Sequence, residues 1–456
     1  MSSLSSIMDT SLSAMFSART ALNVVAHNIA NSNTPGYSRQ RTMFGTRHPN
    51  VMTYGSLGRG VTVTGIRRMT DTFLQDNFRV QNSHLATYTE VQSALQEVEA
   101  IFGSVENDHF GDTLNSFFAA WSELATLPTD DSLKTGVVTA AQAVATEFHS
   151  MNSTLTDLKE SIETTLRTEV GSYNDLLLQV ANLNQQIVAA ESGGSTANDL
   201  HDQRDSVIDQ ISQLAKVSAH YRDDGSVTLL IAGRTMVSRD RAEQVEVRWA
   251  ESDAGVELKI VTDGTRQEVT FTEGKLAGLL EARDNHVQST LDALDGLASI
   301  IAEKVNEIHL QGRSGSSSGL AFFTGDNSSN LEVHSAILNN HSLVATSRTG
   351  SQGDNDLALE MANLSTTAIS SSNTASLTSS YRSILVDLAS QASRYEFLVE
   401  NQDNVVASVD ARLASARGVS LDEEGASLVQ YQNAYQAAAR VITTVQEMFA
   451  TLIDLV

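Results

Sequence analysis

Residues 420 to 456 read SLDEEGASLVQYQNAYQAAARVITTVQEMFATLIDLV, and apolar side chains recur there every three or four residues. This spacing places them along one face of an α-helix, and its persistence over five heptads is typical of a coiled-coil seam. Ser420 and Glu423 have the spacing of a capping box, which predicts the start of the helix. The seam contains Leu421, Glu424, Leu428, Tyr431, Tyr435, Ala438, Ile442, Val445, Phe449, Leu452 and Val456. Glu424 is its one charged position.

The first thirty residues carry a second seam with the same spacing. Its members are Met1, Leu4, Met8, Ser11, Met15, Ala18, Leu22, Val25 and Ile29. The turn-forming cluster from 31 to 36 ends this helix, because Pro35 disfavours helical geometry at Thr34. Residues 1–70 hold seven arginines and one aspartate, whereas residues 420–456 hold five carboxylates and one arginine. Opposite charge therefore favours pairing of the two ends with each other, or of each with a neighbouring subunit.

The composition of this chain of 456 residues excludes several kinds of site and several classes of partner. Cysteine is absent, which excludes disulfides, thiolate nucleophiles and cysteine-ligated metals. Three prolines in the whole chain leave long helices uninterrupted. The net charge of −25 makes nucleic acid and anionic membranes poor partners. No stretch has the 18 or so apolar residues of a membrane span, and no basic residue precedes Arg19 to form a secretory signal.

The middle of the chain predicts one long rod-like helix and one β region. Apolar residues keep helical spacing from about 135 to 190, which corresponds to a helix of roughly 80 Å. Residues 222–272 switch to the two-residue alternation of strands. We therefore expect a mainly α fold with an inserted β-domain. It would have terminal coiled-coil arms, an elongated helical bundle built from nested N- and C-terminal halves, and a small antiparallel β-domain projecting from the bundle.

The same reading gives the expected domain boundaries. An N-terminal arm, 1–45, pairs with a C-terminal arm, 420–456. The helical bundle combines 46–221 with 273–419, and the β-domain occupies 222–272.

One short stretch could suggest hydrolytic chemistry. His201, Asp202, Arg204 and Asp205 place acids, a base and a cation on one helical segment. We favour a solvated helix face, with His201 and Asp205 one turn apart. The histidines form no HExxH pair, and no Lys-Ser or Lys-Thr follows the glycines between 55 and 60. We therefore expect no catalytic, metal or cofactor site.

Two long motifs at opposite ends carry a family resemblance. Residues 26–37, AHNIANSNTPGY, resemble the amino-terminal signature of the bacterial flagellar axial proteins, which are the rod, hook and hook-associated proteins. GVSLDEE at 418–424, YQNAYQAAARV at 431–441 and Met448-Phe449 resemble the carboxy-terminal signature. Four further blocks resemble the hook-associated members: YSRQ at 37–40, GVTV at 60–63, FFAAW at 117–121 and DLHDQRD at 199–205.

This resemblance implies a structural, non-enzymatic component of the junction between hook and filament. It implies type III export, an extracellular position on the flagellum, and self-assembly into a helical or ring layer. The implied partners are the hook protein, a second hook-associated junction protein and an export chaperone on the C-terminal arm; no cofactor, nucleic acid or membrane is implied. The predicted assembly seam consists of Met8, Met15, Leu22, Ile29, Leu428, Tyr435, Ile442 and Phe449.

Two alternatives remain open from the sequence. Another axial protein, such as hook, rod or flagellin-like protein, fits the terminal seams, although flagellin lacks the NTPGY motif and the helix at 135–190 disfavours rod and hook proteins. A cell-wall hydrolase of flagellar assembly would need paired carboxylates in a cleft. An elongated bundle of the long helices with the β-domain at its side would favour the hook-associated interpretation.

Overall fold

The computed structural model describes residues 2–52, 55–103, 109–252, 255–314, 317–351, 353–368 and 375–454. These residues form two compact units. The first combines Met1–Leu85, Val170–Gly274 and Gln402–Val456, and the second combines Ala86–Glu169 and Lys275–Asn401. Three long helices contribute to both units: α2 (Thr72–Phe102), α4 (Asp131–Glu191) and α10 (Leu377–Arg417).

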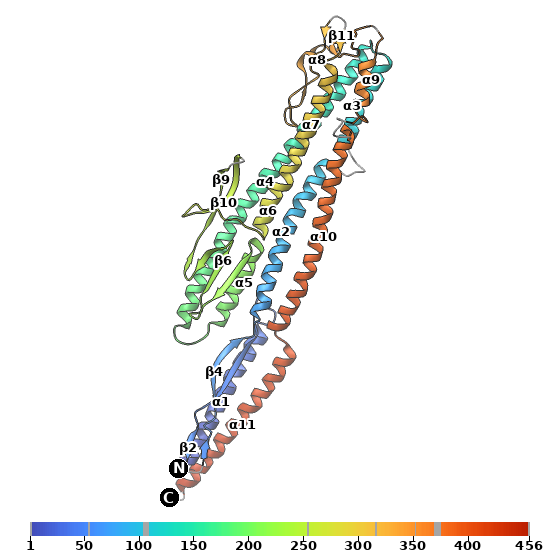
Figure 1. Ribbon diagram of the computed structural model, residues 1–456. Helices are drawn as coiled ribbons and strands as arrows, with labels where there is room; N and C mark the ends of the chain where they lie inside the picture. The colour runs from blue at the N-terminus through green and yellow to red at the C-terminus, as the bar shows by residue number, and fades with distance from the viewer. Residues whose placement is uncertain are drawn as a thin grey trace. The chain divides into compact units, whose positions relative to one another are not determined.

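The terminal helices pack together in the first unit. Helix α1 (Ser2–Ala30) lies along α11 (Leu421–Asp454), as Figure 1 shows. The pairing is antiparallel, because Asn28 at the end of α1 contacts Glu424 at the start of α11. Met1 and Val456, the outermost members of the two predicted seams, lie outside the described residues.

A two-stranded ribbon covers another side of α1. Strands β1 (Gln40–Thr46) and β4 (Val61–Arg68) pair in antiparallel fashion, and both contact α1. Between them, β2 (Asn50–Met52) and β3 (Gly55–Leu57) form a hairpin. Gly60 permits the close approach of β4 to α1: its φ is +87°, and a Cβ there would lie 2.2 Å from Ser13 Oγ.

Two antiparallel sheets complete the first unit beside α5 (Asn198–Leu214). The four-stranded sheet has the order β5-β6-β7-β8, and β9 pairs with β10. Their strands are Val217–Tyr221, Val227–Ile231, Arg234–Ser238, Arg241–Ala242, Val245–Ser252 and Gly255–Thr262. Val227, Leu229 and Ile231 alternate inward and are buried. The sheet begins at Val217, which pairs with Ile231.

The second unit is helical around an aromatic core. Its remaining elements are α3 (His109–Thr126), α6 (Lys275–Glu281), the π-helical turn η1 (Ala282–Val287), α7 (Gln288–His309), β11 (Arg313–Ser314), β12 (Ser317–Ser318), β13 (Phe323–Thr324), β14 (Glu332–Val333), α8 (Ser335–Asn339), the 3-10 turn η2 (His341–Leu343) and α9 (Asp356–Asn363). Phe117 and Trp121 on α3 are fully buried against Phe322. The FFAAW block at 117–121 thus lies on α3 and contributes to this core.

Helix α4 also confirms the long helix expected from the sequence. Its bounds lie within four residues of the predicted 135–190. Its apolar stripe is buried along its whole length: Val144, Phe148, Met151, Leu155, Leu158, Ile162, Leu166, Val170, Tyr173, Leu177, Val180 and Ile187. The mainly α fold with an inserted antiparallel β region is confirmed.

Candidate functional site

The eight predicted seam residues lie on α1 and α11, the two helices that pack together in the first unit. Each is half-buried within one chain: Met8, Met15, Leu22, Ile29, Leu428, Tyr435, Ile442 and Phe449. The buried positions of these helices include their heptad neighbours Ala18, Val25, Ala438 and Val445. Further large apolar side chains are exposed on the same two helices: Ile7, Phe16, Val429, Val441, Met448, Leu452 and Ile453. The paired helices therefore retain apolar surface for further contacts.

Glu424 is the charged residue in the apolar seam of α11, and its carboxylate is buried and hydrogen-bonded. Its side chain is only 2% exposed, and it accepts a hydrogen bond from Arg39 Nε at 2.7 Å. Asn28 Nδ2 donates to the other carboxylate oxygen at 3.0 Å. The exposed neighbour Glu423 binds Arg39 Nη1 at 2.6 Å. Burial opposes the charged form of Arg39, but the two glutamates outweigh it and raise its pKa.

Asn28 links this ion pair to the turn that follows α1. Its Oδ1 accepts from Tyr37 Oη at 2.7 Å and from the Gln40 amide at 2.9 Å, while its Nδ2 also donates to the Gln40 carbonyl. Asn28 is 1% exposed, so all of these bonds form away from solvent. Burial, followed by the carboxylates of Asp199, Asp202 and Glu424, raises the pKa of Tyr37. We call Asn28, Tyr37, Arg39, Gln40 and Glu424 the terminal lock.

The same ends confirm one electrostatic expectation. Arg39 of the basic N-terminal segment pairs with Glu423 and Glu424 of the acidic C-terminal segment within one chain. Glu423 also retains the helix-start contact, with its amide 3.5 Å from Ser420 Oγ. The reciprocal half of the predicted capping box is replaced, because the Glu423 carboxylate bonds to Arg39.

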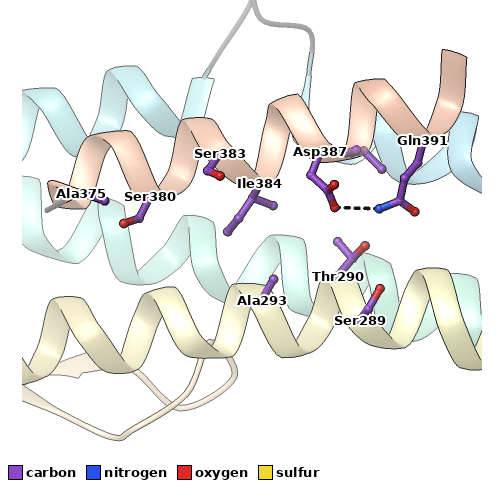
Figure 2. Close-up of a pocket in the computed structure, with 10 residues that line it drawn as sticks. Ser289, Thr290, Ala293, Ala375, Ser380, Ser383, Ile384, Asp387 and Gln391 are labelled. Carbon is purple, nitrogen blue, oxygen red and sulfur yellow. Dashed lines mark hydrogen bonds between the residues drawn. The ribbon is translucent and has the colours of Figure 1, made fainter. Parts of the chain in front are cut away.

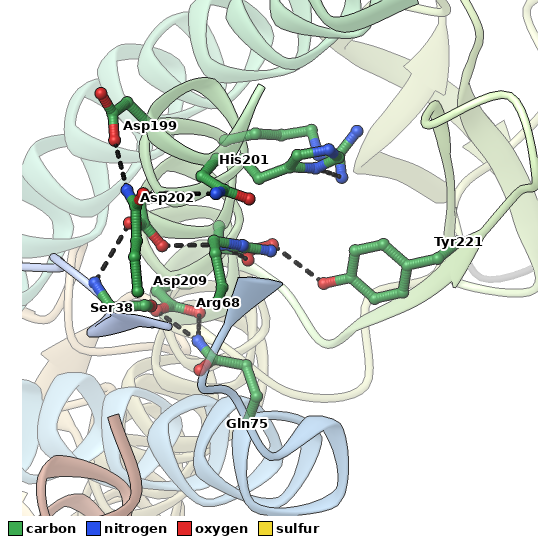
Figure 3. A network of polar contacts seen from close by, with 12 residues as sticks. Ser38, Arg68, Gln75, Asp199, His201, Asp202, Asp209 and Tyr221 are labelled. Atoms are coloured by element: carbon green, nitrogen blue, oxygen red, sulfur yellow. Dashed lines mark hydrogen bonds and ion pairs between the residues drawn. The ribbon is translucent and has the colours of Figure 1, made fainter. Parts of the chain in front are cut away.

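A second polar network joins α5 to β4 and α2 (Figure 3). Arg68 Nη1 lies 2.7 Å from Asp202 Oδ1 and 2.9 Å from Asp205 Oδ2. Asp202 also accepts from the Ser38 amide at 3.1 Å, which ties α5 to the terminal turn. Arg79 Nε bonds to Asp209 at 2.7 Å, and Arg79 is 1% exposed. We call this set the α5 network.

The expectation of a solvated face around His201 is wrong. Asp202 is 6% exposed and Arg204 is fully buried. The physical reason is that Arg68 of β4 and Arg79 of α2 meet the carboxylates here and replace water as their partners. Burial raises the pKa of Asp205, but Arg68, Arg79 and Arg204 outweigh it, so its pKa lies below the usual range.

The hydrogen bonds of the network leave His201 no free nitrogen. Arg204 Nη2 donates to its Nδ1 at 2.9 Å, so Nε2 carries the proton and donates to Glu191 at 2.8 Å. Burial, opposed by the Glu191 bond, lowers the pKa of His201. Tyr221 Oη donates to Asp205 at 2.9 Å, and burial raises its pKa to about 12. Acids and base are thus paired with each other, an arrangement suited to holding elements together.

Cavities near these residues offer no free reactive group. One of about 510 Å³ is lined by Arg68 of the α5 network and by His201 and Tyr221, whose bonds are given above. In the second unit, a cavity of about 480 Å³ lies between α7 and α10 (Figure 2). There Asp387 accepts from Gln391 Nε2 at 2.7 Å, and Gln391 Oε1 bonds to His286. Across the residues that the structure describes, no three His, Asp or Glu side chains are grouped to hold a metal ion.

Sequence analysis did not identify the residues that make the most polar contacts in the terminal lock and in the α5 network. Asn28, Arg39 and Glu424 were seen only as parts of motifs or as an exception in a heptad. The signal that could have found them was that exception, because a charged residue at a core heptad position needs a buried partner. Arg68 and Arg79 had no such signal. Among the helices whose residues are described, none is long and apolar enough to cross a membrane.

Comparison with known families matches three parts of the chain. The model described as "Flagellar hook-associated protein FlgK helical domain" matches residues 95–323. The model of the flagella basal body rod protein matches residues 8–37, which include Asn28. The model of the flagellar basal body rod FlgEFG protein C-terminal region matches residues 415–455, which include Glu424. The two rod-protein models thus coincide with the two helices that the terminal lock joins.

Similar proteins and one solved structure agree with these matches. Flagellar hook-associated protein 1 of Bacillus subtilis is 29% identical over 98% of this chain and 97% of its own length. The Escherichia coli protein of that name is 21% identical over 99% of this chain and 100% of its length. The Salmonella typhimurium protein is 26% identical over 68% of this chain, and the match spans 57% of its length.

The solved structure is that of the flagellar hook junction protein FlgK from Burkholderia pseudomallei. It superposes with a TM-score of 0.66 at 14% identity, over 76% of this chain and 100% of the other. This likeness concerns the fold. Because the hook-associated helical-domain model matches half of the sequence, the chain belongs to the flagellar hook-associated protein FlgK family.

Proposed function

We infer that this chain is a structural component of the bacterial flagellum that forms the junction between hook and filament. The observation that carries this inference is the match of residues 95–323 to the FlgK helical domain. The relatives that share this chain's whole length are named flagellar hook-associated protein 1. The extended buried stripe of α4 and the paired terminal helices suit a load-bearing part.

We propose that the terminal helices are the assembly segment. The seam residues Met8, Met15, Leu22, Ile29, Leu428, Tyr435, Ile442 and Phe449 are half-buried in one chain. A neighbouring subunit could cover the rest of each side chain, and burial of apolar surface contributes about 25 cal/mol per Å². Contacts of this kind, repeated from copy to copy, build a ring or a helical layer. The arms 1–45 and 420–456 are the corresponding proposed assembly domains.

A protein at the junction between hook and filament has a neighbouring protein on each side. We propose that one side of the assembled layer contacts the hook protein and the other a second hook-associated junction protein. Reaching that place requires export from the cell, for which a type III route and a chaperone are proposed. The C-terminal arm is the proposed chaperone site, since an amphipathic helix with exposed Val441 and Met448 can lie in an apolar groove. No catalytic role is proposed, because His201, Asp202 and Asp205 are bound to other side chains.

Charge placed in the seam tests this function. Leu428→Asp or Ile442→Asp should cost several kcal/mol at each repeated contact, because a carboxylate loses its hydration there. Gln430→Asp and Gln446→Asp add the same charge at exposed positions of α11 and serve as controls. In a strain that lacks the wild-type protein, we expect the seam variants to leave hooks without filaments and to shed flagellin into the medium. Normal filaments on the seam variants would contradict the assembly role of α11.

A further inference from the structure

Four arginines in or beside the β1/β4 ribbon have no ion-pair partner among the described residues. Arg41 and Arg67 are exposed and directly opposite each other in the strand register. Arg47 and Arg59, at either side of the β2/β3 hairpin, are also exposed. Over the residues the structure describes, none of these four guanidinium groups has an ion-pair partner, in contrast to Arg39 and Arg68. We call Arg41, Arg47, Arg59 and Arg67 the ribbon arginines.

Their placement costs free energy in the isolated chain. Directly opposite residues in an antiparallel pair have Cβ atoms about 5 Å apart, and like charges at that distance repel. Salt screens such a pair only in part, because the screening length is about 8 Å at physiological ionic strength. A chain with 55 acidic residues and 30 basic ones could have compensated this charge locally. The repulsion would be relieved by carboxylates brought from outside.

The ribbon also presents apolar side chains between its arginines. Met43 lies two residues from Arg41, on the same outward side of β1, and is 43% exposed. Val51 and Leu57 on the hairpin are 85% and 45% exposed. Arginine mixed with exposed apolar residues is typical of protein–protein interfaces. The ribbon therefore has the composition of a docking surface.

The complementary charges occur on other helices of the same unit. Asp403 and Asp410 on α10, two turns apart, and Asp422 and Glu447 on α11 are exposed. None of these four carboxylates has an ion-pair partner within the described part of the chain. In the view of Figure 1, the ribbon and α11 lie on opposite sides of α1. Within the described residues, one copy thus carries unpaired arginines on the ribbon and unpaired carboxylates on α10 and α11, which is the condition for a head-to-tail contact between copies.

We propose that the outward face of the β1/β4 ribbon docks on the exposed carboxylates Asp403, Asp410, Asp422 and Glu447 of α10 and α11 in a second copy of this chain. The proposal rests on the assembly role given above and adds the surface through which copies recognise each other. Met43 and Val51 would be covered in this contact. Ion pairs at its rim would set orientation and partner choice more than affinity.

A photo-reactive amino acid in place of Arg67 tests the partner directly. In cells whose hooks carry the full-length protein, irradiation should give a band of twice the chain's mass, and peptide mapping should place the cross-link on α10 or α11. The same substitution at Arg241, an exposed residue of β8, is the control and should give no such band. A cross-link from position 67 to hook protein, or to any other protein, would overturn the proposal.

Charge reversal gives an independent measurement. Arg41→Glu with Arg67→Glu should leave export unchanged but lower the fraction of hooks that carry the protein by about tenfold. Arg241→Glu with Arg266→Glu changes charge equally on the exposed insert and should leave occupancy unchanged. Full occupancy in the ribbon variant would refute the ribbon contact alone, whereas absence of the wild-type chain from hooks would refute the junction function. Wild-type binding to phosphatidylglycerol vesicles that the ribbon variant lost would instead assign the ribbon to a membrane.

Discussion

Glu423 and Glu424 make a matched pair for testing the terminal lock, because both bind Arg39 and only one is buried. Glu424 is 2% exposed and accepts from Arg39 and Asn28. Glu423 is 63% exposed and binds Arg39 alone. Glu424→Ala removes two hydrogen bonds to a buried charge, and each such bond is worth about 1.5–3 kcal/mol. Arg39 keeps Glu423 and Asn28 keeps Gln40, so we expect a net loss of about 3 kcal/mol.

Glu423→Ala should have little effect on the same helices. Exposed ion pairs contribute about 0–1 kcal/mol, since water and salt already screen them. The two alanine variants should thus differ by at least about 2 kcal/mol although they remove the same side chain from adjacent positions. The difference isolates burial as the cause.

Amide hydrogen exchange of the full-length protein measures both variants in the segments concerned. A loss of about 3 kcal/mol raises the opening equilibrium of α1 and α11 roughly 150-fold, so amides in 2–30 and 421–454 should exchange correspondingly faster in Glu424→Ala. Amides of α3 and α7 in the second unit are the internal control. Equal acceleration in the two variants, or unchanged exchange in Glu424→Ala, would refute the claim that the buried carboxylate fixes α11 on α1.

Three further variants test other parts of the account. His309 is buried and accepts a hydrogen bond from the Ala345 amide, and burial lowers its pKa to about 4. Below pH 6.5, the usual pKa of histidine, the unfolded state takes up the proton first, so the free energy of unfolding should fall by about 3 kcal/mol between pH 6.5 and pH 4. His309→Gln should remove this pH dependence, as measured by urea unfolding at each pH. Asp205→Asn should cost about 3 kcal/mol at pH 7 and less as the pH falls, because the depressed pKa of Asp205 gives stability that is lost as the pH falls through that pKa; a cost that does not change with pH would exclude the ionic origin. Gly278→Ala would bring a Cβ within 2.7 Å of the Thr87 carbonyl and should lower the melting temperature, whereas Gly296→Ala on α7 meets nothing within 4 Å and should not.

Local periodicity was sufficient to predict the helices. The stripe of α4, the aromatic face of α3 and both terminal seams depend on side chains three or four residues apart, so one segment contains the whole signal. Proline scarcity and the turn cluster after Ala30 added the helix ends. The strands β6 to β10, which lie within the predicted 222–272, followed in the same way, whereas β5 lies before that range and only Val217 in it is buried.

Long-range polar pairing could not be predicted from these patterns. Glu424 meets Asn28 across 396 positions, and Arg68 meets Asp202 across 134, distances at which spacing carries no information. The segment around His201 has a helical period, but the period does not say what covers each face. Arg68 and Arg79 cover it here, which turned an expected solvated face into a buried network. The π-helical turn η1 likewise depends on packing within the second unit.

The position of the protein on the flagellum tests the central claim most directly. Gold-labelled antibody against the chain, applied to isolated flagella with hooks attached, should mark a single narrow band where the hook meets the filament. Flagella from cells that produce the Gln430→Asp control should show the same band, and hooks from cells that produce Leu428→Asp should carry none. Label distributed along the hook or the filament, or a bare junction in wild-type cells, would contradict the assignment of this chain to the hook–filament junction.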